Sequence, residues 1–158
     1  AAEPDDTVVS VVGWVSARQR FDKPIGGEPA VGLALPCQHR YPGTFESLHD
    51  FDLVDEQGRT LFIGAADGRL FGAPNLVLDS HQLRLLYSDL GVPSGATPSS
   101  WHVHTLRDGD PVMVLGTKQT IVDPGESGFR GPPTRLALAA SPPRPLVVFS
   151  LPAERRAG

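Results

Sequence analysis

Glycine and proline recur along this chain at intervals too short for long helices. The 158 residues include 17 glycines and 16 prolines, and they are scattered rather than clustered. Proline lacks a backbone N–H and glycine favours turns, so both interrupt regular elements. The pattern predicts many short strands joined by turns. At this length we expect one domain over residues 7–152, with 1–6 as a disordered edge and 153–158 as a flexible tail.

The clearest strand signal lies at residues 7–18. Valines occupy both faces of this segment, with Val8 and Val12 on one side and Val9 and Val11 on the other. This predicts burial on both faces, as in a barrel wall or a strand covered by another element. Gly13 in its middle is typical of a bulge or a bend where a small barrel turns a corner.

Further strands follow along the chain. Period-two alternation at 50–55, a turn that ends in Gly58 and a second strand segment at 59–64 predict a β-hairpin. Three later strands are expected, at 111–117, 134–138 and 146–151.

One helix is expected between the hairpin and these later strands. Either Asp79 or Ser80 can cap its start, and Gly91 can end it. Apolar side chains recur within it at helical spacing, namely Leu83, Leu86, Tyr87 and Leu90. Together the elements favour a mainly-β fold: a small OB-like, partly open β-barrel with one short helix.

Charge and cysteine content narrow the functional classes. The formal net charge is −4 and the basic residues form no block, which argues against nucleic acid as the main partner. Cys37 is the single cysteine, so no disulfide can form within the chain, and we interpret it as a small, partly buried hydrophobe. No apolar run approaches the roughly 20 residues that span a bilayer.

The most suggestive candidates for chemistry are His102 and His104. Two histidines at i and i+2 on a strand project to the same side, and neutral imidazole is a common ligand for zinc or copper. A third ligand would have to come from His39, His49, His81 or a distant carboxylate, and no zinc-site spacing supports one. We therefore expect surface or hydrogen-bonding histidines, with no bound metal and no cofactor.

Ser47, His49 and Asp50 suggest a second catalytic interpretation, a hydrolase arrangement. Neighbours in a strand point to opposite faces, which spoils that geometry, and no Gly-x-Ser-x-Gly segment presents a nucleophile. The glycine-rich stretches at 24–27 and 125–128 also lack the features of a phosphate-binding loop. No catalytic residue is therefore expected.

Three loops are the candidate binding rim, at residues 21–28, 92–100 and 123–133. They are rich in proline, glycine and serine, and loops carry much of the binding function of small barrels. The side chains expected to contact a partner are Arg18, Arg20, Lys23, Trp101, His102 and His104.

A series of short motifs, in order, covers most of the chain. They are Gly13-Trp14-Val15 and the segments at 23–30, 51–58, 109–116 and 146–150. This series resembles the GIDE domain, also called the BAM domain, a β-rich module of mitochondrial membrane-anchored ubiquitin ligases and of many bacterial membrane proteins.

The resemblance implies an OB-like barrel beside a membrane that makes protein or ligand contacts, with anchoring by flanking segments. Ligase activity in that family belongs to a separate RING domain, whose zinc sites need several cysteines. We therefore expect a non-catalytic binding or scaffolding module that recognises a protein or a small ligand through its loops. It would be membrane-associated if the resemblance holds and cytoplasmic otherwise.

Two alternatives remain open at this point. One is a small metal-dependent enzyme that uses His102 and His104. The other is an oligonucleotide-binding barrel, which the net charge disfavours. The oligomeric state does not follow from the sequence.

Overall fold

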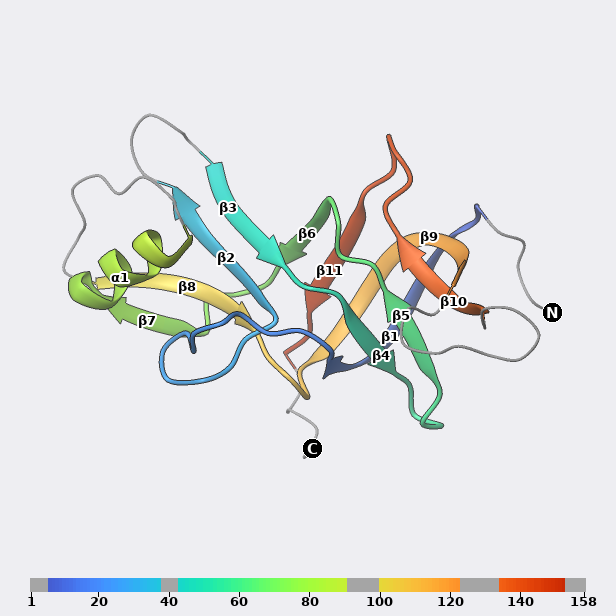
Figure 1. The fold of residues 1–158 in the computed structure, drawn as a ribbon, viewed down its shortest axis with the longest axis horizontal. Coiled ribbons are helices and arrows are strands. Elements are labelled where there is room, and N and C mark those ends of the chain that lie inside the picture. Colours follow the sequence, from blue (N-terminus) through green and yellow to red (C-terminus); the bar gives the residue numbers. More distant parts are fainter. Residues whose placement is uncertain (1–5, 38–42, 91–99, 123–133, 153–158) are drawn as a thin grey trace.

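The computed structural model describes residues 6–37, 43–90, 100–122 and 134–152, which form eleven strands and one helix (Figure 1). This confirms the expected mainly-β fold with a single helix. In chain order the elements are β1 (Val8–Ala17), β2 (Gly32–Cys37), β3 (Gly43–Leu48), β4 (Phe51–Val54), β5 (Thr60–Ile63), β6 (Gly68–Phe71), β7 (Leu76–Asp79), α1 (Ser80–Leu90), β8 (Ser100–Leu106), β9 (Pro111–Val122), β10 (Thr134–Ala139) and β11 (Leu146–Ser150).

Five strands close into a small barrel. Their order around the ring is β1-β4-β5-β10-β9, and the pairing of β1 with β9 completes it. All neighbours in the ring are antiparallel except β5 and β10, which run parallel. The small barrel is as expected, although its ring is closed. Strands β11 and β6 extend the sheet from β9 outside the ring.

Strand β1 corrects one expectation about burial. Val15 points into the barrel and is buried, whereas Val8 and Val12 are 43% and 58% exposed. The prediction that both faces of this segment are buried is therefore wrong. A barrel wall has one inner face, and the outer face of β1 is left in solvent here.

Gly13 serves close packing rather than a bulge. The register of β1 against β9 continues through it without interruption. A Cβ atom at this position would lie 2.5 Å from the carbonyl oxygen of Val54, so only glycine lets β1 approach β4 this closely.

Strands β4 and β5 form the predicted hairpin. The carboxylate of Asp55 accepts hydrogen bonds from the backbone N–H groups of Gln57 and Arg59, both at 2.9 Å. Gly58 has a φ of 79°, the left-handed conformation that this turn requires. The local turn chemistry explains why the hairpin was visible in the sequence.

A second sheet lies beside the barrel, with the order β3-β2-β8-β7 and antiparallel pairing throughout (Figure 1). It is built from two excursions of the chain: β2 and β3 leave the barrel between β1 and β4, and β7 and β8 leave it between β5 and β9. Pairing of β2 with β8 joins the two excursions.

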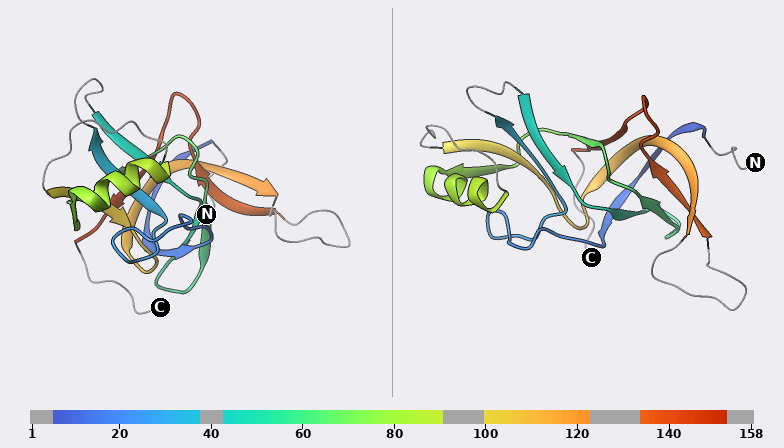
Figure 2. Two further views of the ribbon diagram at one scale, coloured as in Figure 1. Left: turned by 60° about the vertical axis from the view of Figure 1, so that its left-hand side comes forward. Right: turned by 45° about the horizontal axis from the view of Figure 1, so that its top comes forward.

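Helix α1 lies across this second sheet (Figure 2). Asp79 caps it, because its Oδ1 accepts from the Gln82 backbone N–H at 2.7 Å while Gln82 Oε1 accepts from the Asp79 N–H at 3.0 Å. Leu83, Leu86 and Tyr87 are buried as expected. They pack with side chains of β2, β7 and β8 into a core distinct from the barrel core.

The two parts of the molecule nevertheless share side chains. Val31 directly precedes β2, Ala34 lies on β2 and Leu106 lies on β8. All three nevertheless belong to the buried cluster that fills the barrel. The barrel core therefore continues under the second sheet. The segment at residues 6–7 also joins the fold, since the Asp6 N–H donates to the carbonyl oxygen of Lys118 at 2.9 Å.

Candidate functional site: a groove between a loop and the helix

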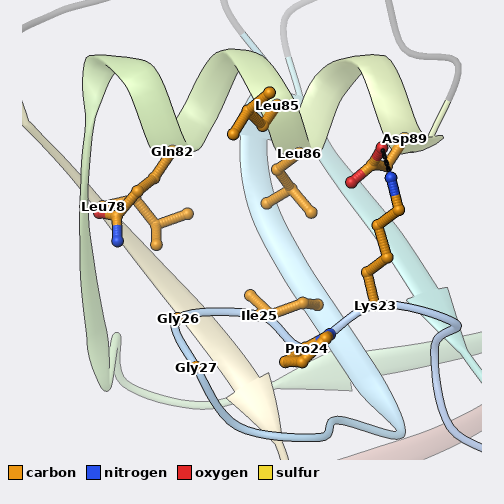
Figure 3. Close-up of a pocket in the computed structure, with 10 residues that line it drawn as sticks. All are labelled: Lys23, Pro24, Ile25, Gly26, Gly27, Leu78, Gln82, Leu85, Leu86 and Asp89. Carbon is orange, nitrogen blue, oxygen red and sulfur yellow. Dashed lines mark hydrogen bonds and ion pairs between the residues drawn. The ribbon is translucent and has the colours of Figure 1, made fainter.

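A groove opens between the loop at residues 21–28 and helix α1 (Figure 3). Its volume is about 380 Å³, and an adjoining hollow of about 310 Å³ extends it toward Phe21 and Asp22. We call it the loop–helix groove. Its lining residues are Lys23, Pro24, Ile25, Gly26, Gly27, Leu78, Gln82, Leu85, Leu86 and Asp89.

A two-residue turn gives the loop its shape. The Ile25 N–H donates to the Glu28 carbonyl oxygen at 2.9 Å, which leaves Gly26 and Gly27 at the tip. Their φ angles are 64° and 86°, as in the mirror-image turns that favour glycine at both central positions. A Cβ on Gly26 would also meet the side chain of Leu76 at 2.7 Å. Residues other than glycine would therefore be strained at the tip of the turn, and Gly26 packs directly against the second sheet.

The groove has a fixed apolar floor and an apolar rim. Ile25, Leu78 and Leu86 form the floor, and each is less than a tenth exposed because it also belongs to the second core. Leu85 sits on the helix at the rim and is 53% exposed. Leu85 therefore adds exposed apolar surface beside a hollow whose floor is apolar.

Polar groups flank this apolar surface. Lys23 Nζ and Asp89 Oδ1 form an ion pair of 3.0 Å that bridges loop and helix, and the two side chains are 72% and 36% exposed. Exposed pairs of this kind contribute on the order of 0–1 kcal/mol, so an incoming charged group can replace one partner at little cost. Gln82 lines the groove from the first turn of the helix (Figure 3).

The structure does not bring the predicted basic residues together. Lys23 lines the groove. Arg18 instead lies against the barrel, where its Nε donates to Asp52 Oδ2 at 2.9 Å and its guanidinium lies 5.1 Å from the Phe62 ring centroid. Arg20 is exposed between them in sequence. Of the three predicted loops, 123–133 and all of 92–100 except Ser100 lie outside the described residues.

The two histidines of β8 also differ in environment. His102 is exposed, while His104 is 6% exposed at the junction of the barrel with the second sheet. Trp101 pairs with Leu78 through the backbone, and its side chain lies outside the described residues. The two histidines therefore lie in different environments although only one residue separates them on β8.

His104 uses both of its ring nitrogens. Nδ1 lies 2.9 Å from the Ala73 carbonyl oxygen and Nε2 lies 2.8 Å from Ser150 Oγ. One of these bonds would have to break before the ring could bind a metal ion. Within the described ranges, no three histidine, cysteine or acidic side chains are gathered so as to hold one.

The residues of the rejected hydrolase arrangement have separate structural contacts. The His49 ring packs edge-on against Phe21, with centroids 4.6 Å apart. The Asp50 carboxylate accepts from the Ala65 backbone N–H at 2.7 Å. Neither contact involves Ser47.

A second hollow, of about 410 Å³, adjoins His104. Its lining residues are Ala73, Pro74, Asn75, His104, Arg107, Asp110, Pro111, Ser150, Leu151 and Pro152. Burial lowers the pKa of His104, and the bond to Ala73 and the negative charge of Asp110 offset this only in part; the positive charge of Arg107 lowers it further.

Sequence reasoning missed two residues that matter in these hollows. Leu85 had a signal, because it is apolar yet lies off the buried stripe of the helix. Ser150 had none, since it meets His104 from 46 positions away through the packing of β11 near β8.

No helix in the described ranges is long and apolar enough to cross a membrane. Comparison with known proteins adds no assignment, because no family model, curated protein or solved structure matches this chain.

Proposed function

We propose that this protein is a binding module that holds a segment of a partner protein in the loop–helix groove. The observation that carries the proposal is the half-exposed Leu85 at the rim of a preformed apolar groove whose floor is fixed by core residues. A floor of this kind needs no ordering when a ligand binds, which lowers the entropic cost of association.

The groove favours an extended peptide segment with one large apolar side chain next to a charged one. A volume of about 380 Å³ suits one or two side chains rather than a whole folded surface. The Lys23–Asp89 pair can exchange with a charged neighbour of the apolar anchor. The space beside Gly27 is open, so the backbone of the turn can be approached by another chain.

The resemblance to the GIDE domain supports a place of action next to a membrane. That part of the proposal rests on the sequence motifs alone. It is independent of the groove, and the experiment below does not require it.

A peptide selection tests the groove directly. Dodecapeptides displayed on phage are selected on the wild-type protein, and the dominant peptides are then synthesised with a fluorescent label. Their affinity is measured by fluorescence anisotropy for wild type and for Leu85→Ser. Fully burying a leucine contributes about 1.5–3 kcal/mol, and covering Leu85, which is 53% exposed, contributes about half of that. We therefore expect Leu85→Ser to weaken binding by roughly 4- to 12-fold.

Leu136→Ser is the matched control. Leu136 is also an exposed leucine, at 44%, but it lies on β10 of the barrel. Its variant should bind the peptides as wild type does. Dominant peptides that bind Leu85→Ser as tightly as wild type would overturn the proposal. So would tight binding of a labelled twelve-residue oligothymidylate that falls steeply with salt, because it would favour the oligonucleotide-binding barrel.

A further inference from the structure

The second hollow presents a serine hydroxyl to a buried histidine. Ser150, the last residue of β11, is half-buried, and both Ser150 and His104 line the hollow. The Ser150 Oγ to His104 Nε2 distance of 2.8 Å is that of a good hydrogen bond. The pair lies between β8 of the second sheet and β11 beside the barrel, away from the loop–helix groove.

The hydrogen bonds define which atom holds the proton. A backbone carbonyl oxygen only accepts, so the 2.9 Å contact with Ala73 requires a proton on His104 Nδ1. In a neutral ring Nε2 then carries the lone pair, and the Ser150 hydroxyl donates to it. The doubly protonated ring would reverse this bond, but burial lowers the pKa of His104 and so disfavours that form near neutral pH.

Close packing holds the pair in this geometry. A Cβ atom on Gly72 would lie 2.7 Å from Cε1 and Nε2 of His104 and 3.0 Å from the Cβ of Ser150. The backbone at Gly72 therefore presses directly on both members. A nucleophile, a base within hydrogen-bond reach and a third group that orients the base are the parts that activate a serine.

We infer that Ser150 is an activated nucleophile with His104 as its general base, and that the adjoining hollow accepts small acyl esters. The walls suit such a substrate, because Pro74, Pro111 and Leu151 offer rigid apolar surface and the volume of about 410 Å³ fits a small molecule. This activity goes beyond the binding function proposed for the groove and does not depend on it.

The chemistry follows from the proton positions. Ser150 Oγ forms a bond to the ester carbonyl carbon while its proton passes to Nε2 of His104. The tetrahedral adduct then breaks the bond to the leaving oxygen, which takes the proton from His104. Water repeats the sequence on the acyl-serine, releases the carboxylic acid and restores the hydroxyl.

An alkyl fluorophosphonate is the probe for this nucleophile. Its reaction forms a bond from Ser150 Oγ to phosphorus, expels fluoride and leaves the serine proton on His104. Intact mass spectrometry should show one phosphonyl group on the wild type, with peptide mapping at Ser150. Ser150→Ala should stay unlabelled, and Ser16→Ala, which removes another half-buried strand serine, should label as wild type does.

A conservative variant separates the chemical from the structural role of His104. In His104→Asn the side-chain amide can still donate to the Ala73 carbonyl but cannot take the proton, so labelling should slow about 100-fold or more while circular dichroism stays that of wild type. If that variant does not fold, the wild-type labelling rate is followed from pH 8 to pH 5. The rate should stay constant at first and then fall at a pH below the ordinary pKa of histidine. The fall should occur where His104, which lies near Asp110 and Arg107, becomes protonated.

Three outcomes would overturn the inference. They are an unlabelled wild type, equal labelling of a folded His104→Asn variant, and a labelling rate that does not fall on acidification.

Discussion

At the scale of single residues, His104 is buried and hydrogen-bonded to two groups from distant parts of the chain. Its partners Ala73 and Ser150 lie 31 and 46 positions away along the sequence. The resulting burial of a neutral imidazole also sets how the protein responds to acid.

We expect acid to destabilise the protein through His104. Its pKa is lowered in the folded state by burial, so between that value and the ordinary value near 6.5 the unfolded chain binds more protons than the folded one. The stabilisation is thus fully present above about pH 6.5 and is lost as pH falls toward the lowered pKa. Urea unfolding measured from pH 8 to pH 5 checks this.

The His104→Asn variant serves as the reference for that measurement. It keeps every other titrating group, so the difference between its pH curve and that of wild type isolates the histidine. Parallel curves would contradict the expectation.

At the scale of elements, local chemistry made some parts predictable and long-range pairing hid others. The hairpin of β4 and β5 and the helix were found because Asp55, Gly58 and Asp79 act within a few residues of their own positions. Strands β6 and β7 were not predicted because their partners, β11 and β8, lie farther along the chain. Strands β2 and β3 pair with each other, but Gly32, Pro36 and Gly43 interrupt the strand pattern in the sequence. The sequence predicted the loop at 21–28 and the helix separately. It did not predict that the two line one groove, because their relative position depends on tertiary packing.

The helix cap gives a prediction at this scale. The sequence allowed either Asp79 or Ser80 to cap α1, and the structure assigns the role to Asp79. Asp79→Ala should lower the free energy of unfolding by about 0.5–2 kcal/mol. Ser80→Ala should change it by less than about 0.5 kcal/mol. Urea denaturation of the two variants distinguishes them, and equal losses would argue against the capping box.

At the scale of the whole molecule, the two buried clusters are in contact, and we expect them to unfold together. Val31 and Leu106 belong to the barrel core although they accompany the second sheet. The Val31 N–H also donates to the Leu106 carbonyl oxygen at 2.8 Å. Neither part can lose its packing without exposing apolar side chains of the other.

Two tryptophans allow this cooperativity to be measured. Trp14 lies on β1 of the barrel and Trp101 on β8 of the second sheet, and the chain has no others. Trp101→Phe leaves a reporter in the barrel, and Trp14→Phe leaves one in the second sheet. We expect Leu83→Ala to cost about 2–5 kcal/mol and to shift both fluorescence midpoints together. Separate midpoints in denaturant would show two independent folding units.

The joining of the second sheet through β2 and β8 has a consequence for how such a chain can vary over time. One excursion from the barrel supplies β2 and β3, the other supplies β7 and β8, and each leaves a bare strand edge without its counterpart. The hydrogen-bonded ring of five barrel strands closes without either, although Val31, Ala34 and Leu106 from the excursions also fill its core. We therefore expect related chains to lengthen or shorten the two excursions together around the same ring. A chain that lost only one would leave the edge of β2 or β8 without a pairing strand.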